Sequence, residues 1–479
     1  MKHLCDLEDL QPVYDVAVVG AGPAGMAAAT TVAGYGLKVI VLDENLDVGG
    51  QIYRGLRTSS VDQRAILGST YAKGEPLVRE FDEAGGEYLS GAAVWMASRA
   101  LELGVSKDQR SRIIRSRHII LATGSLERPF PVRGWTLPGV LTVGAAQGLL
   151  KTSGVVPTGR FVLAGTGPLL WLFASQAISS GHAPVAILDT TRRAQRFRAS
   201  TALPGFLASE YLPAAIKLMR HVRANVPVIR DVRAIEAEGE ESISRITYQR
   251  AGHAPRSIDI DHLLLHQGVV PNAQLPSAAG CGMKWNVWQA CWQPEVDRWG
   301  QTSVDSIAVA GDGAAIVGAE SASRTGRLCG LNAAAKLGRI DVRGRDAAAA
   351  QIRHELGRLA RGRRYIDMAF LPDRRFRVAS AEALACRCEE VRGRQITELL
   401  DIHGAIGPNQ LKFFLRCGMG SCQGRQCAIT ITEMIAAHRR VSPAAVGSFR
   451  LRFPVKPITV AEVASLPQDL SDMRAVIRK

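Results

Sequence analysis

The sequence lacks the segments that mark an exported or membrane-spanning protein. No basic leader with a short apolar run and a cleavage site opens the chain, so we expect no signal peptide. The uncharged stretch 16–37 is long enough for a membrane helix, but its five glycines and Pro23 favour a turn-rich soluble segment. We therefore expect a cytoplasmic protein, with peripheral association at the inner membrane as the alternative.

The chain also lacks a redox-active dithiol in its first 380 residues. No Cys-x-x-Cys occurs there, and no G-C-x-P-x-K pattern follows Gly49-Gly50. A disulfide reductase passes its electrons through such a dithiol, so this activity is disfavoured. Five of the nine cysteines lie between Cys386 and Cys427, which in a reducing compartment indicates metal or cluster ligation.

A nucleic-acid-binding motif is missing despite a formal charge of +15. The basic residues are scattered, without zinc-finger spacing, a basic helix or interleaved aromatic residues. We interpret the charge as a solvated basic surface and predict no nucleic-acid partner. Docking onto a protein partner or a membrane surface is the next interpretation.

What the sequence does contain is a glycine-rich turn between a predicted buried strand and a helix. Residues 14–19 are nearly all apolar, as in parallel strands, and the helix is expected over 26–33. Such a turn lets backbone approach a pyrophosphate, and the helix N-terminus faces the anion. A second strand over 38–42 ends in acidic residues that can bind a ribose diol. The predicted contacts are Gly20, Gly22, Pro23, Ala24, Gly25, Asp43 and Glu44.

Three further segments favour FAD over NAD at this turn. Gly49-Gly50-Gln51 follows the acidic residues, as expected for a loop that passes close to an isoalloxazine ring. Residues 119–124 resemble the strand and turn that close the FAD domain of two-dinucleotide flavoproteins, and 309–312 resemble their second FAD motif. In that motif the aspartate contacts the ribityl chain. The predicted contacts are Gly50, Gln51, Ala122, Thr123, Gly124, Gly311 and Asp312.

A second glycine-rich unit follows and indicates an internal duplication. Gly165-Thr166-Gly167 comes after a predicted strand over 161–164, and Asp189 ends the next strand, where it favours NAD over NADP. Leu170 replaces the third glycine and alters the packing of helix on strand. We predict nucleotide contacts at Gly165, Gly167 and Asp189. NAD, another adenine nucleotide and a retained fold without nicotinamide turnover all remain open.

The C-terminal region carries four cysteines spaced for metal. Cys386 and Cys388 form a C-x-C pair, and Cys422 and Cys427 form a C-x4-C pair. Four thiolates suit structural zinc or a [2Fe-2S] cluster, in which each iron takes two cysteines. A cluster can exchange electrons with a flavin in the same chain, whereas zinc cannot, so we predict [2Fe-2S]. Cys417 is interpreted as a bystander.

Together these motifs predict an α/β fold with two dinucleotide-binding domains and a small helical four-cysteine domain. We expect a discontinuous FAD-binding domain over 1–150 and 284–340, with an NAD(P)-like domain inserted over 151–283. The remaining predicted segments are a linker over 341–383, a [2Fe-2S] ferredoxin-like domain over 384–437 and a tail over 438–479.

Three motifs resemble one family over nearly the whole chain: GGQIYR at 49–54, LHQGVVPN at 265–272 and CQGRQC at 422–427. The family is the α (A) subunit of heteromeric bacterial amine dehydrogenases, which includes opine oxidase, D-hydroxyproline dehydrogenase and the hydrogen cyanide synthase B subunit. The cysteine segment is similar to bacterioferritin-associated ferredoxin.

The resemblance implies that a secondary amine or amino acid is oxidised to an imine on a partner subunit, an FAD-dependent amine oxidase-like β chain. An FMN at the α/β boundary and a small γ subunit are further implied candidates. This chain would relay electrons through FAD and the cluster to a respiratory acceptor. Carried over residue by residue, FAD binds Gly20, Gly22, Gly25, Asp43, Gln51, Gly311 and Asp312, and the cluster binds Cys386, Cys388, Cys422 and Cys427.

The sequence itself marks no catalytic residue. No acid–base pair or nucleophile motif indicates an amine-oxidising centre, and a lone His266 at a strand end is more often structural or a flavin-domain contact than a general base. Oxidation of an opine (octopine or nopaline) is the predicted activity, with D-hydroxyproline and glycine still open as substrates. Two other hypotheses remain: a self-sufficient NAD(P)H:acceptor oxidoreductase and a non-enzymatic docking role for the cysteine module.

Overall fold

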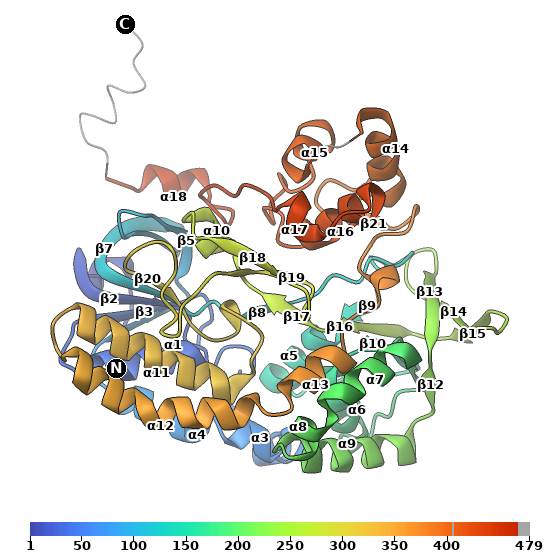
Figure 1. Cartoon of the computed structure of the whole chain (residues 1–479), viewed down its shortest axis with the longest axis horizontal. Coiled ribbons are helices and arrows are strands. Elements are labelled where there is room, and N and C mark those ends of the chain that lie inside the picture. Colours follow the sequence, from blue (N-terminus) through green and yellow to red (C-terminus); the bar gives the residue numbers. More distant parts are fainter. Residues whose placement is uncertain (405–406, 468–479) are drawn as a thin grey trace, which may run out of the picture.

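The computed structural model describes residues 1–404 and 407–467, and it contains two parallel-stranded units and a C-terminal module (Figure 1). Among the helices of these described residues, none combines the length and hydropathy needed to cross a membrane.

The first unit is an eight-stranded sheet built around β2 (Val13–Val19). Its hydrogen-bonded order is β1 (Lys2–Leu4), β4 (Glu87–Ser90), β3 (Val39–Asp43), β2, β7 (Arg110–Leu121), β6 (Glu102–Lys107) and β5 (Ala93–Ala97), with β20 (Ile307–Val309) paired to β7. β2 runs parallel to both β3 and β7, so the carboxyl ends of these strands meet at one edge. Burial of these strands on both faces explains their continuous apolar runs.

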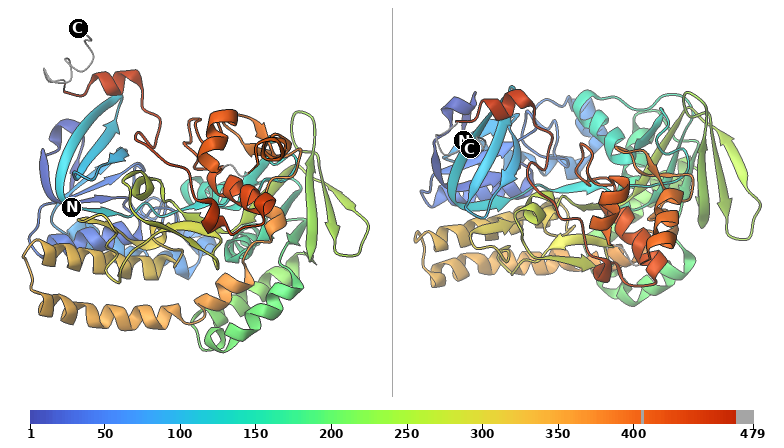
Figure 2. Two further views of the ribbon diagram at one scale, coloured as in Figure 1. Left: turned by 45° about the horizontal axis from the view of Figure 1, so that its top comes forward. Right: turned by 90° about the horizontal axis from the view of Figure 1, so that it is seen from above.

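Helices cover one face of this sheet in successive layers. α1 (Pro23–Gly34) packs against α11 (Ala319–Lys336), which carries α12 (Val342–Ala360) on its outer side (Figure 2). The α1–α11 contact is close because α11 presents small residues, and a Cβ on Gly326 would lie 2.0 Å from the Ala24 carbonyl oxygen. The predicted linker over 341–383 therefore begins with a packed helix of this layer.

The second unit is a five-stranded parallel sheet flanked by helices. Its order is β12 (Val228–Arg230), β11 (Ala186–Asp189), β10 (Phe161–Thr166), β16 (His262–Gln267) and β9 (Val140–Thr142). The helices that accompany it include α5 (Val143–Ser153), α6 (Pro168–Ser179) and α9 (Tyr211–Asn225). β9 belongs to this sheet, so the first domain cannot run to residue 150 as predicted.

Smaller elements join the units. β8 (Ser125–Glu127) pairs with β17 (Val269–Pro271), and β18 (Met283–Asn286) pairs with β19 (Cys291–Pro294). A three-stranded sheet, β13 (Val232–Glu238), β14 (Arg245–Arg250) and β15 (Arg256–Asp259), borders the second unit. The short helices are η1 (Leu7–Asp9), α2 (Val61–Leu67), α3 (Ser69–Ala72), α4 (Glu75–Glu83), α7 (Arg193–Ala199), η2 (Ser200–Ala202), α8 (Leu203–Leu207), α10 (Gln274–Ala278), η3 (Gly311–Gly313), α13 (Arg363–Ala369) and η4 (Arg374–Phe376).

The cysteine module has its own apolar core, in which Ile396, Leu411 and Ile431 are fully buried. It contains β21 (Leu384–Cys386), β22 (Val391–Arg392), α14 (Gly393–His403), α15 (Pro408–Leu415), α16 (Ala428–Arg439) and α17 (Pro443–Val446). In Figure 1 it is the orange-to-red group at the upper right.

The predicted tail over 438–479 is packed where the structure describes it. Phe449 lies in the core of the cysteine module, and Val455 lies in the core of the first sheet. α18 (Val460–Ala464) contacts β7, and the Ser111 amide donates to Ser465 Oγ at 2.8 Å. Residues 468–479 lie outside the described part. The tail therefore ties the cysteine module to the first unit.

Candidate functional site

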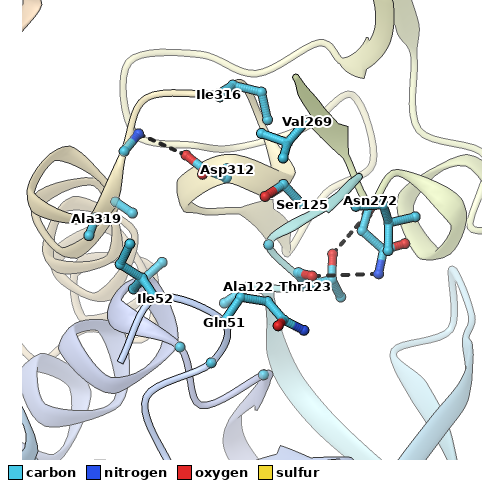
Figure 3. A pocket seen from close by; sticks show the side chains of 18 of the residues that line it. Gln51, Ile52, Ala122, Thr123, Ser125, Val269, Asn272, Asp312, Ile316 and Ala319 are labelled. Atoms are coloured by element: carbon cyan, nitrogen blue, oxygen red, sulfur yellow. Dashed lines mark hydrogen bonds between the residues drawn. The ribbon is translucent and has the colours of Figure 1, made fainter. Parts of the chain in front are cut away.

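A cavity of about 460 Å³ begins at the carboxyl ends of β2, β3 and β7 and reaches the second unit. Figure 3 shows side chains from the first unit and from the segment around β17 placed around this open space. The predicted FAD contacts that line it are Gly20, Gly22, Pro23, Ala24, Asp43, Glu44, Gly50, Gln51, Ala122, Thr123, Gly124 and Asp312. Two predicted contacts, Gly25 and Gly311, are not among its lining residues.

The first glycine turn is closed by backbone contacts that only glycine allows. Gly20 has a φ of +103°, and a Cβ on Gly20 would lie 2.5 Å from the Ala122 carbonyl oxygen. A Cβ on Gly25 would lie 1.7 Å from the Gly20 carbonyl oxygen, so Gly25 supports the turn from behind. The turn is therefore held tightly against β7, with the N-terminus of α1 at the cavity.

Asp43 is buried at the end of β3 and is bound by neutral donors. Its Oδ2 accepts the Ala21 amide at 2.5 Å, and its Oδ1 accepts the Asn45 amide and side chain at 2.7 Å. Burial raises the pKa of Asp43, and these hydrogen bonds oppose that rise. Glu44, the next residue, also lines the cavity and pairs with Lys456 of the tail. Asp43 thus holds the turn in place through the Ala21 amide, while Glu44 is exposed at the end of the cavity where a ribose would lie.

Asp312 and Thr123 also line the cavity. Asp312 Oδ1 accepts the amides of Val317 at 2.8 Å and Gly318 at 3.0 Å, just before α11. Burial raises the pKa of Asp312. Thr123 Oγ1 donates to the Asn272 carbonyl at 2.9 Å, which joins the end of β7 to β17 (Figure 3).

Lys151 in α5 is a cavity residue that the sequence did not reveal, because it belongs to no motif. Its side chain is buried, and its Nζ donates to the Gln51 carbonyl and to Gln147 Oε1, both at 2.9 Å. Burial lowers the pKa of Lys151 to about 7.

These features fit FAD. The cavity offers a glycine cradle at a helix N-terminus for a pyrophosphate, acidic residues for a ribose and a buried cation beside the Gly50-Gln51 loop. The residues that would hold FAD are therefore those that line the cavity, with Gly25 supporting the turn.

The second glycine turn differs, because its acidic residue is already neutralised. Asp189 is buried, and its Oδ2 pairs with Arg196 Nη2 at 2.5 Å. Gly167 lines the large cavity, whereas Gly165 and Asp189 do not. Leu170, in place of the third glycine, is fully buried in the apolar core. The structure therefore brings only part of the predicted second site to the large cavity.

A second cavity of about 410 Å³ lies beside this neutralised aspartate and is strongly basic. Its charged lining residues are Arg193, Arg196, Arg230, Asp231, Arg250 and Arg256. The arginines outnumber the acid, so the cavity suits an anion.

His266 is held by a carboxylate. Its Nδ1 lies 2.5 Å from Glu127 Oε1, and Glu127 Oε2 accepts the Gly144 amide at 2.7 Å. These bonds link β16, β8 and the start of α5, which supports the structural interpretation of His266.

The cysteine loop touches the wall of the flavin cavity. Gln274 in α10 donates to the carbonyls of Cys422 at 3.1 Å and Gln423 at 3.0 Å. Its own carbonyl accepts Arg425 Nε at 2.7 Å, and both Gln274 and Arg425 line the large cavity. No sequence motif predicted this bridge, since it joins residues about 150 positions apart in the chain.

The cysteines themselves come together in two contacts. Cys386 lies close to Cys417 and Cys427, and Cys388 lies close to Cys422. Cys417, interpreted as a bystander, is therefore in contact with a predicted ligand. No group of three or more His, Cys, Asp or Glu in residues 1–404 and 407–467 is arranged to hold a metal ion. The cluster remains a prediction that rests on the donor chemistry of these thiols.

Two family models match separate stretches of the chain. The model described as pyridine nucleotide-disulphide oxidoreductase matches residues 14–328, and the sarcosine oxidase A3 domain matches residues 408–466. The fold is similar to that of L-proline dehydrogenase from P. horikoshii, with a TM-score of 0.68 and 17% identity over 96% of this chain and 80% of that chain.

Two curated relatives extend over almost the full length. The opine oxidase A subunit of Agrobacterium tumefaciens (strain Ach5) is 44% identical over 486 residues, covering 99% of this chain and 96% of the relative. The HcnB subunit of hydrogen cyanide synthase from Pseudomonas aeruginosa is 29% identical over 475 residues, which cover 96% of this chain and 99% of that relative. The chain is therefore a flavin oxidoreductase that belongs to the pyridine nucleotide-disulphide oxidoreductases and, within them, to the family of the opine oxidase A subunits.

Proposed function

We propose that this chain is the electron-transfer α subunit of a heteromeric opine (octopine or nopaline) dehydrogenase. Substrate would be oxidised to an imine on a partner β subunit that resembles FAD-dependent amine oxidases. The observation that carries the proposal is the contact of the cysteine loop with the flavin cavity through Gln274 and Arg425. Two redox groups in one chain transfer electrons efficiently only when they are close, and this contact would make the proposed FAD and cluster neighbours.

The proposed FAD site is the large cavity, where FAD would supply two-electron chemistry. Gly20, Gly22 and Gly25 shape the pyrophosphate turn, Asp43 and Glu44 form its ribose end, and the carboxylate of Asp312 faces the ribityl end.

The proposed [2Fe-2S] ligands are Cys386, Cys388, Cys422 and Cys427, which would let the chain deliver electrons singly. Support comes from the two thiol contacts and from Glu389 and Arg416, which form an ion pair at 3.1 Å beside them. A respiratory carrier is the proposed acceptor, which places the complex in the cytoplasm or at the inner membrane surface. An FMN at the boundary between subunits and a small γ subunit complete the proposed assembly.

The experiment is anaerobic visible spectroscopy of the chain co-expressed with its oxidase-like partner. Octopine, nopaline, D-hydroxyproline, glycine and NADH would each be added separately. We expect flavin bleaching and cluster reduction with an opine and no change with NADH. Reduction of the isolated chain by NADH would replace this proposal with a self-sufficient reductase.

Matched cysteine variants separate the cluster from the flavin. Cys422→Ser is expected to lose the iron and the cluster spectrum while it keeps FAD. Cys5→Ser removes an exposed free cysteine near the N-terminus and is expected to keep both the cluster and FAD. An iron content unchanged in Cys422→Ser, or zinc in place of iron in the wild type, contradicts the cluster assignment.

A further inference from the structure

Lys151 is a buried ammonium held only by neutral groups. Its side chain is 4% exposed, and its two partners are the Gln51 carbonyl and the Gln147 amide oxygen, each at 2.9 Å. No carboxylate lies within ion-pair distance of Lys151 in the described part of the chain, and Arg54 is the charged group that influences it. Buried charges are normally paired, so an unpaired ammonium in a cavity calls for an anionic ligand.

The position of Lys151 in the cavity identifies which part of the ligand it meets. A pyrophosphate on the Gly20 turn and a ribose near Glu44 leave the opposite part of the cavity for the flavin ring. That part is lined by Gln51, Thr123, Gln147 and Lys151. The ammonium is bound to the backbone of Gln51, in the loop expected beside the ring.

The neutral partners matter because they leave the charge intact. Gln147 is fixed in turn by Gln176, whose Oε1 accepts its Nε2 at 3.1 Å. This chain of amides orients the ammonium, whereas a carboxylate partner would cancel its field. A preorganised charge in a buried site acts strongly on charge that develops next to it.

We propose that Lys151 stabilises the negative charge of the reduced flavin ring and thereby sets its reduction potential. Oxidation of an amine to an imine releases two electrons and two protons. In the proposed assembly this occurs on the partner subunit, which releases both protons, and the two electrons pass to FAD in this cavity. Uptake of two electrons and one proton from solvent would leave one negative charge on the ring, and Lys151 would be its counter-ion. The proposal rests on the proposed function only in requiring FAD in this cavity.

Burial lowers the pKa of Lys151, so the ammonium keeps its charge best when an anion lies beside it.

The test compares Lys151→Gln, which removes the charge but keeps hydrogen-bonding groups, with Lys151→Arg, which keeps the charge. Both are made in the full-length FAD-loaded chain, and exposed Lys284→Gln is the control for loss of one positive charge. The flavin midpoint potential is measured by spectroelectrochemistry. Sulfite affinity is measured by titration, because sulfite adds to the flavin and leaves the same negative charge on the ring without turnover.

We expect Lys151→Gln to bind sulfite about tenfold more weakly and to lose about tenfold in the equilibrium constant of two-electron reduction. That loss equals about 30 mV more negative potential. Lys151→Arg is expected to keep most of the wild-type value, and Lys284→Gln all of it.

An unchanged potential and sulfite affinity in FAD-loaded Lys151→Gln overturns the proposal. Loss of FAD from both Lys151 variants, with thermal stability retained, also overturns it and makes Lys151 a flavin-binding residue only. A wild-type chain that binds no FAD defeats the proposed function itself, so the two failures are distinct.

Discussion

The two glycine-rich turns of this chain share a strand–turn–helix plan but not a chemistry. At the first turn the acidic residue, Asp43, accepts only neutral hydrogen bonds, and the turn opens onto the large cavity. At the second turn Asp189 is paired with Arg196, and Leu170 fills the helix–strand contact. A duplicated motif can thus preserve the strand–turn–helix plan while the acidic residues of its two copies have different partners.

The largest expected effect comes from adding one methyl group to the first turn. Gly25→Ala places a Cβ 1.7 Å from the Gly20 carbonyl oxygen, so the turn must open. We expect FAD content, measured as flavin absorbance per chain, to fall by about tenfold or more. Gly34→Ala, in the same helix with nothing within 4 Å, is the control and should keep FAD. Full flavin loading of Gly25→Ala would break the comparison.

At the second turn the expected effect is on stability and not on flavin content. Leu170→Ala leaves a cavity in the core and should cost about 2–5 kcal/mol of unfolding free energy in a denaturant titration. FAD should remain bound, since Leu170 is not among the residues that line the flavin cavity. Exposed Leu207→Ala should change little. Loss of FAD from a folded Leu170→Ala chain would show that the second turn supports the first.

The two units differ in the surroundings of a buried histidine. His118 in the first sheet has no hydrogen-bond partner among residues 1–404 and 407–467, and burial lowers its pKa to about 4, whereas His266 in the second sheet is bound to Glu127. Protonation of His118 is disfavoured in the folded state. Its contribution to the free energy of unfolding is therefore fully present above pH 6.5 and is lost as the pH falls towards 4. The lost contribution amounts to about 3 kcal/mol.

His118→Leu should remove this part of the pH dependence, measured as the difference in unfolding free energy between pH 7 and pH 4.5. Exposed His253→Leu should leave the pH dependence unchanged. Identical acid sensitivity of His118→Leu and the wild type would assign the loss to other groups.

The smallest expected effect is at the ion pair of the second site. Arg196 is 38% exposed, so Arg196→Gln should cost only about 1 kcal/mol. Surface Arg245→Gln, which breaks the exposed pair with Asp259, should cost less still. NADH should bleach the flavin in neither variant. Bleaching of Arg196→Gln by NADH would identify the ion pair as the feature that closes the second site.

Local sequence patterns predicted the strands and turns closely. The strand expected over 14–19 is β2 (Val13–Val19), and the helix expected over 26–33 lies within α1 (Pro23–Gly34). Likewise 161–164 lies within β10, and Asp189 ends β11 as predicted. These predictions succeeded because apolar runs and glycine turns depend on neighbours in the chain.

The errors and omissions involve contacts between distant segments. β9 (Val140–Thr142) joined the second sheet because it pairs with β16, more than 100 residues away. Lys151 and Gln274 line the flavin cavity, and Cys417 lies close to Cys386, although no motif assigned these residues a role. A lone polar residue in an apolar helix has the same local pattern whether it meets solvent, a neighbour or a ligand.

The sequence by itself determined the class of this protein: the spacing of its glycines, acids and cysteines encodes turns and donor sets that act over short distances. The tertiary structure alone decided the surroundings of the two acidic residues, because Arg196 pairs with Asp189 while Asp43 keeps neutral partners. It also decided that the cysteine loop lies against the flavin cavity, since the Gln274–Arg425 bridge forms only when α10 and the C-terminal module are packed together.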